Sequence, residues 1–180
     1  MGRVVQEDQL LSDDRLAELL VAVSARASAL AEETFLANLQ ALVTLLPDLK
    51  DRLLRLQSKL LVALVEDVPQ AGRRLIELKG MLPMANVSAI VVSRPALLLD
   101  EEFNAIPGAV AQLRSLFNDK DLSRMVESQP LLLVEDITAI IQQLESLMPG
   151  VDVGERLKKY PNTVLQLQRG TRRLGPGAEF

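Results

Sequence analysis

Six basic side chains near the end of the chain are the residues best suited to binding chemistry: Arg156, Lys158, Lys159, Arg169, Arg172 and Arg173. No acidic residue interrupts this stretch. Guanidinium and ammonium groups bind phosphates, carboxylates and anionic headgroups, and such binding weakens as salt rises. Three interpretations stay open: a solvated basic stretch, a docking surface for an acidic protein or a membrane surface, and a nucleic-acid contact. We take these six as candidate partner-binding residues.

Catalytic chemistry finds little support in the residue types. The 180 residues include no His and no Cys, which removes the usual imidazole base, the thiolate nucleophile and the commonest zinc ligands. Ser58 and Lys59 are adjacent on an expected helix, where neighbouring side chains do not face each other. The segment from Gly150 to Gly154 is a loop and helix start, because no strand precedes it. We expect no enzyme activity, no catalytic residue, no cofactor and no metal.

Charge and composition argue against a general nucleic-acid binder. The net charge is −4, and aromatic residues make up only 3% of the chain, so stacking on bases has little support. Arg94, Arg114 and Arg124 each have Asp or Glu nearby, which favours surface ion pairs over a basic groove. No uncharged run is long enough to span a bilayer. The first residues resemble neither a signal peptide nor a transit peptide. The alternative that the sequence is a mature form without its targeting segment stays open.

The elements that must position these residues are marked by a recurring phrase. Pro95, Pro130 and Pro161 are each followed by an apolar run, at intervals of 35 and then 31 residues. A fixed period of this size indicates a repeat architecture. Proline disfavours helical backbone in the residue before it, so Arg94, Gln129 and Tyr160 should end their helices. The repeat unit is therefore a helix, a proline-marked corner and a second helix.

Each half of this unit has its own pattern. Short helices are expected at Asn86 to Ser93, Asp119 to Gln129 and Asp152 to Tyr160, and Asn118 marks the start of the second of these. The second helices carry one apolar face at aligned positions: Val68, Phe103 and Ile137; Ala71, Ile106 and Ile140; Leu75, Val110 and Leu144; Leu78, Leu113 and Leu147. Acidic clusters should cap these helices: Glu66–Asp67, Asp100–Glu102 and Glu135–Asp136.

The N-terminal third also reads as helical. Residues 12–46 form one long helix or two joined helices, with Ser12 as the N-cap. Pro47 then opens a helix from Asp48 to about Leu64. Its leucines at 49, 53, 56, 60 and 64 favour packing within the molecule over a coiled-coil seam. Ser58 to Leu61 keep the register of the proline phrases without a proline, so this helix is a candidate degenerate first unit.

The segment from Asp119 to Leu133 closely resembles the repeat of the mitochondrial transcription termination factor family. That repeat joins an acidic helix start and a leucine-rich helix to a proline followed by leucines. Phe103 to Leu113 is similar to the family's second helix, and Leu147 to Pro161 looks like the opening of another unit. The resemblance covers about residues 64–166. It implies an α-solenoid, sited in mitochondria or chloroplasts, with a nucleic-acid or gene-expression role and no catalytic residues.

Together these patterns predict an all-α chain: a short α-solenoid of helix-pair repeats with an N-terminal helical hairpin as cap. We expect a cap at residues 1–47, repeats at 48–166 and a basic tail at 167–180. Because the repeats carry slightly more acidic than basic residues, we favour a module that docks on a ribosome, polymerase or thylakoid complex. The alternative is a nucleic-acid-binding regulator of organellar transcription, splicing or RNA stability. From the resemblance, the expected location is the chloroplast, with the mitochondrion as alternative.

Overall fold

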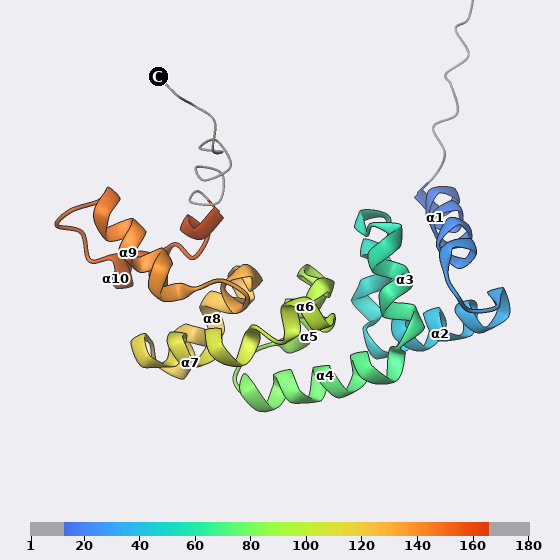
Figure 1. The fold of residues 1–180 in the computed structure, drawn as a ribbon, viewed down its shortest axis with the longest axis horizontal. Coiled ribbons are helices and arrows are strands. Elements are labelled where there is room, and N and C mark those ends of the chain that lie inside the picture. Colours follow the sequence, from blue (N-terminus) through green and yellow to red (C-terminus); the bar gives the residue numbers. More distant parts are fainter. Residues whose placement is uncertain (1–12, 166–180) are drawn as a thin grey trace, which may run out of the picture. The chain divides into compact units, whose positions relative to one another are not determined.

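The computed structural model describes residues 13–165, and within this range the chain is built from helices and turns without a strand. The all-α prediction is confirmed for this part of the chain. The contacts divide the protein into two compact units, residues 1–68 and 69–180. Pro47, where the cap was expected to end, lies inside the first unit. Figure 1 shows the helices of both units.

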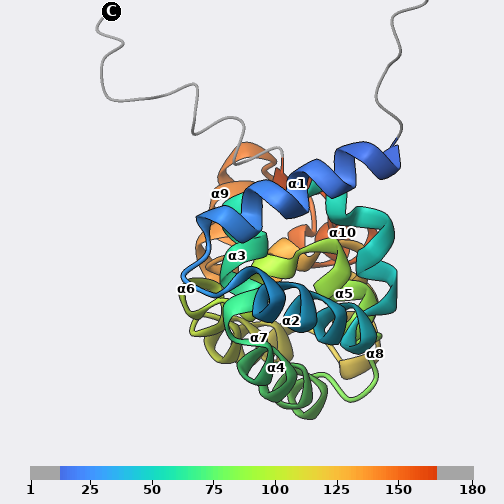
Figure 2. The same cartoon turned by 90° about the vertical axis from the view of Figure 1, so that its right-hand side faces the viewer.

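The first unit contains three α-helices and one 3₁₀ helix: α1 (Asp13–Ala27), α2 (Glu32–Leu45), η1 (Pro47–Arg55) and α3 (Ser58–Glu66). Of the expected helical stretch 12–46, the described residues 13–46 contain two joined helices, and the expected cap Ser12 lies outside the described residues. Helix α1 packs against α3, and the two lie side by side (Figure 2). The Ser24 and Ser58 hydroxyls join them at 2.8 Å. The fully buried core of this unit includes Phe35, Leu42, Leu46, Leu49 and Leu61.

The expected helix from Asp48 to Leu64 is wrong. The chain forms the 3₁₀ helix η1, becomes extended at Leu56 (φ −81°, ψ 141°) and only then begins α3. Leucines three and four residues apart suit a 3₁₀ turn and an α turn alike, so their spacing does not encode this break. The break reverses the chain so that α3 packs on α1 and α2. Leu49, Leu53 and Leu64 are buried within the unit, which confirms intramolecular packing of these leucines.

The second unit repeats the predicted pattern of helix, corner and helix. Its elements are α4 (Val68–Met81, whose first residue belongs to the first unit), α5 (Val87–Ser93), η2 (Pro95–Leu98), α6 (Asp100–Phe103), α7 (Ile106–Leu116), α8 (Asp119–Ser128), η3 (Pro130–Leu133), α9 (Ile137–Leu147) and α10 (Val153–Lys159). The three short helices thus end within a residue of their predicted positions. Each begins with a side-chain cap, in which Asn86, Asn118 or Asp152 accepts a hydrogen bond from a backbone N–H three residues later.

The corners confirm the reading of the prolines. Arg94, Gln129 and Tyr160 each end a short helix with nearly the same backbone conformation, at φ −141°, −142° and −132° and ψ 79°, 87° and 72°. The following prolines are buried. Most of the apolar residues after them also turn into the core: Leu97, Leu98, Leu131, Leu132, Leu133 and Val164. Each proline disfavours the helical conformation in the residue before it, which agrees with the end of the helix at each corner.

Leu46, before Pro47, and Met148, before Pro149, have the same conformation (φ −132°, ψ 78° and φ −134°, ψ 68°), so such a corner also lies in the first unit. Ser58 to Leu61 do not form one, because they begin α3. The candidate degenerate first unit therefore has no corner at Ser58 to Leu61.

Most residues of the predicted apolar face of the second helices are buried. Nine of its twelve residues are buried, Val68 and Leu75 are half-buried, and Leu147 is 63% exposed. Of the acidic clusters, Asp136 caps α9 through the Ala139 N–H at 3.1 Å as predicted. Glu66 does not open a helix: it is the last residue of α3 and accepts hydrogen bonds from Ser28 and Ala29. Asp100–Glu102 fill the first turn of α6, where they oppose the positive helix end.

Candidate functional site

Three of the six predicted partner-binding residues lie on α10, the last described helix. Arg156 and Lys159 are exposed, and Lys158 is half-buried. The Lys159 ammonium lies 5.5 Å from the centre of the Tyr160 ring, a cation–π contact. Arg169, Arg172 and Arg173 lie outside the described residues. The structure therefore brings together only the first half of the basic stretch.

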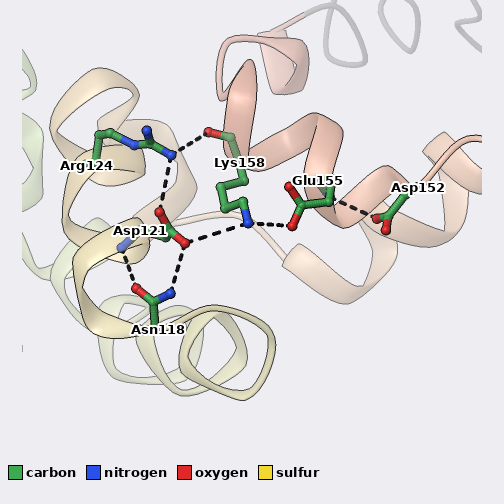
Figure 3. Close-up of polar contacts among 6 residues, drawn as sticks. All are labelled: Asn118, Asp121, Arg124, Asp152, Glu155 and Lys158. Carbon is green, nitrogen blue, oxygen red and sulfur yellow. Dashed lines mark hydrogen bonds and ion pairs between the residues drawn. The ribbon is translucent and has the colours of Figure 1, made fainter.

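Lys158 is not a free cation. Its Nζ lies 3.8 Å from Asp121 Oδ2 on α8 and pairs with Glu155 one turn earlier on its own helix (Figure 3). The hydrogen bond to Glu155 raises the pKa of Lys158 above its ordinary value, and the charges of Glu155 and Asp121 add to this rise. Lys158 therefore joins the neighbouring helices α8 and α10, and its charge is already matched by carboxylates.

A groove opens around this network. We call it the Leu116 groove; it has a volume of about 260 Å³ and is lined by Leu116, Phe117, Asn118, Asp121, Asp152, Gly154, Glu155 and Lys158. Figure 3 shows its polar side chains, which come from the caps and first turns of α8 and α10 and, for Lys158, from the last turn of α10. Leu116 and Phe117 lie at the end of α7. The lining carries three carboxylates against one ammonium group, so the groove favours cations.

The order of this groove comes from the helix caps. Asn118 Oδ1 accepts the Asp121 N–H at 2.9 Å, while Asn118 Nδ2 donates to Asp121 Oδ2 at 2.9 Å. Asp152 Oδ1 accepts the Glu155 N–H at 2.9 Å. Arg124 donates to Asp121 Oδ1 at 3.3 Å and reaches the Lys158 carbonyl at 3.5 Å. Sequence reasoning identified Asn118 as a helix start but neither the Asp152 cap nor the groove, which exists only because α8 and α10 lie next to each other.

The other arginines form the ion pairs expected from their neighbours. Arg94 donates two hydrogen bonds to Glu102 at 2.6 and 2.8 Å, the bidentate arrangement. Arg114 donates to Asp119 at 3.1 Å and to the Met81 carbonyl at 2.8 Å, and Arg124 pairs with Asp121. These contacts confirm ion pairing as the role of the three arginines.

Arg74 is a cation that the sequence analysis missed. Its side chain is buried, donates to the Leu98 carbonyl at 2.5 Å and pairs with Asp100, and its guanidinium lies 4.9 Å from the centre of the Phe103 ring. It ties α4 to the corner that follows α5. Its place between Ala71 and Leu78, one helical turn from each, is the signal that would have put it on the buried face.

Exposed apolar side chains form a second kind of site. Met81, Leu116 and Leu147 end α4, α7 and α9, and they are spaced by the same 35 and 31 residues as the prolines. We call them the apolar row. Leu116 is 50% and Leu147 63% exposed, while Met81 is half-buried. The last residues of these three helices are thus apolar, and those of α7 and α9 are presented to solvent, although Leu147 aligns with Leu78 and Leu113 in the helix register.

Comparison with known proteins gives no further guidance: no family model, no curated protein and no solved structure matches the chain. Within residues 13–165, no group of His, Cys, Asp and Glu is arranged to hold a metal ion. None of the helices in the described range is long and apolar enough to cross a membrane.

Proposed function

We propose that the chain is a non-enzymatic helical-repeat module that docks on a large protein complex of an organelle. The repeats would form a short α-solenoid like that of the mitochondrial transcription termination factors. The chloroplast is preferred over the mitochondrion as its location, on the resemblance of the repeat alone. The lack of His and Cys supports a non-enzymatic role.

One observation carries the proposal: the helices α4, α7 and α9 each end in a residue of the apolar row, and Leu116 and Leu147 are exposed. Large apolar groups exposed at the ends of successive repeat helices suit a protein partner that follows the repeats, since apolar burial drives most protein association. Four of the described cations, Arg94, Arg114, Arg124 and Lys158, are meanwhile paired with carboxylates. Matched charges of this kind offer little to a phosphate backbone.

Nucleic-acid binding stays the second candidate, because Arg156 and Lys159 are exposed at the end of α10 and lead into the basic stretch. Such a contact would engage this stretch rather than the apolar row. The two functions therefore predict sensitivity to different substitutions.

The test compares two sets of variants of the full chain. Purified chain is co-sedimented with ribosomal, polymerase and thylakoid fractions of chloroplasts, and in parallel titrated with RNA and DNA across a salt series. Leu116→Asp with Leu147→Asp should abolish co-sedimentation, while Ile76→Asp, an exposed apolar residue outside the row, should not. Nucleic-acid binding that falls steeply with salt and is lost in Arg169→Glu, Arg172→Glu, Arg173→Glu would overturn the docking proposal.

A further inference from the structure

We propose that the Leu116 groove is the docking site of the chain's own C-terminal segment, residues 166–180, with the Arg172–Arg173 pair held by Asp152 and Glu155. The inference concerns the free protein and goes beyond the proposed function. It assigns a ligand to a groove whose formation required two repeats to be neighbours.

The lining of the Leu116 groove has a net negative charge. Asp121, Asp152 and Glu155 face one ammonium group, and most of the hydrogen-bonding capacity of Asp121 is taken by Asn118, Arg124 and Lys158. Asp152 is exposed, and the Glu155 side chain is 66% exposed, so both offer carboxylate oxygens to a further cation. Anionic ligands are disfavoured by the net negative charge of the lining.

The size and the chemistry of the groove suit a single side chain. A volume of about 260 Å³ is below the range of about 300–1,000 Å³ that holds drug-sized ligands, so a side chain fits better than a free cofactor. Leu116 and Phe117 add an apolar wall beside the carboxylates. Arginine suits this combination, because its guanidinium binds carboxylates bidentately and stacks on aromatic faces while its stem lies along apolar groups.

The chain between Leu165 and Arg172 is long enough to reach the groove. Asn162 Oδ1 accepts from Gln129 Nε2 at 3.0 Å, which places the end of the described chain beside the C-terminal end of α8. The groove lies at the other end of this ten-residue helix, about 15 Å away at 1.5 Å per residue. Arg172 follows Leu165 by seven residues, and seven extended residues span up to about 25 Å. The arginine pair can therefore reach the groove within one chain.

The charge of the C-terminal segment is opposite to that of the groove. Residues 166–180 contain Arg169, Arg172 and Arg173 but only one acidic residue, Glu179. Leu174 follows the arginine pair directly and can cover Leu116 when the arginines meet the carboxylates. Both the charge and the apolar character of the segment thus match the groove.

Paramagnetic relaxation in NMR tests the contact directly. Because the chain has no cysteine, Gly175→Cys provides a single site for a spin label on the full-length protein. The amide signals of Asn118, Gly154 and Glu155 should lose most of their intensity, while that of Phe103 should not. The effect should be lost at about 1 M salt, where the Debye length falls to about 3 Å.

Matched variants identify the groups responsible. Asp152→Asn with Glu155→Gln should abolish the broadening; Asn preserves the cap of α10, and unchanged shifts elsewhere verify the fold. Glu101→Gln with Glu145→Gln removes the same charge from exposed positions outside the groove and should leave the broadening intact. Broadening that is absent, or that survives the groove variant, overturns the proposal. So does broadening seen only between a spin-labelled chain and a separate isotope-labelled chain, which would show docking of a second copy.

Discussion

At the scale of single residues, the buried cation Arg74 shows how a charge can serve the fold. A buried guanidinium is tolerated only with its hydrogen bonds satisfied, and Arg74 has a carbonyl, a carboxylate and an aromatic ring as partners. Asp100 is largely exposed, so water weakens that ion pair. We therefore attribute the role of Arg74 to burial and to the Leu98 carbonyl more than to the charge pair.

Replacing Arg74 should destabilise the protein, whereas replacing its neighbour should not. Arg74→Ala leaves the Leu98 carbonyl without its partner and opens a cavity, so the free energy of unfolding should fall by about 2 kcal/mol. Arg73→Ala removes an exposed side chain that bonds Gln70, and it should change the free energy of unfolding by less than about 0.5 kcal/mol. Urea unfolding followed by circular dichroism measures both. Equal effects of the two substitutions would contradict the assignment.

Glu66 gives the first unit a dependence on pH. The Ala29 N–H and the Ser28 hydroxyl donate to its carboxylate and lower its pKa below the ordinary value of 4.5. A lowered folded-state pKa means that the stabilisation is complete above the unfolded-state pKa and is lost as pH falls through the folded-state pKa.

The neutral variant Glu66→Gln keeps an oxygen acceptor but not the charge. The difference in unfolding free energy between wild type and this variant should therefore shrink as pH falls from about 7 to about 3. Denaturant titrations at a series of pH values measure it, and Glu145→Gln serves as a control for an exposed carboxylate. A constant difference over this range would show that Glu66 contributes nothing through its charge.

At the scale of elements, the proline corners set the repeat. Residues before Pro47, Pro95, Pro130, Pro149 and Pro161 share one backbone conformation, although Pro130 is buried and Pro149 is exposed. Backbone restriction and burial can thus be separated by comparing corners that have the same geometry.

Pro130→Ala should destabilise the protein more than Pro149→Ala. Both substitutions raise the conformational entropy of the unfolded chain, which lowers the free energy of unfolding by about 0.4–1 kcal/mol. Only Pro130→Ala also removes buried apolar surface. The two unfolding free energies can be compared in one denaturant series. If Pro149→Ala were the more damaging change, burial at the corner would not be the stabilising factor.

Local signals explain which elements were predictable. The caps Asn86, Asn118 and Asp152 and the prolines act within a few residues, so the short helices were predicted to within a residue. The break at Leu56 was missed because it depends on where α3 finds its packing partners. At the candidate site, arginine ion pairs followed from nearby carboxylates. The groove did not, because it joins residues more than thirty positions apart.

At the scale of the whole molecule, the division into two units raises the question of what each needs to fold. The second unit buries a core from its own elements, including Leu97, Ile106, Leu113, Leu132 and Ile137. Units with a core of their own generally fold alone. A repeat stack that depends on an N-terminal cap, in contrast, exposes an apolar face when the cap is removed.

We expect residues 67–180, expressed without the preceding chain, to be helical and monomeric and to unfold cooperatively in urea. The difference in unfolding free energy between Arg74→Ala and Arg73→Ala should be the same in this fragment as in the full chain. The reason is that Leu98 and Asp100, the partners of Arg74, lie in the same unit as Arg74. Circular dichroism and sedimentation provide the measurements. A fragment that is unfolded or aggregated would show that residues 1–66 act as the obligatory cap, and the two units would then be one folding unit despite their separate cores.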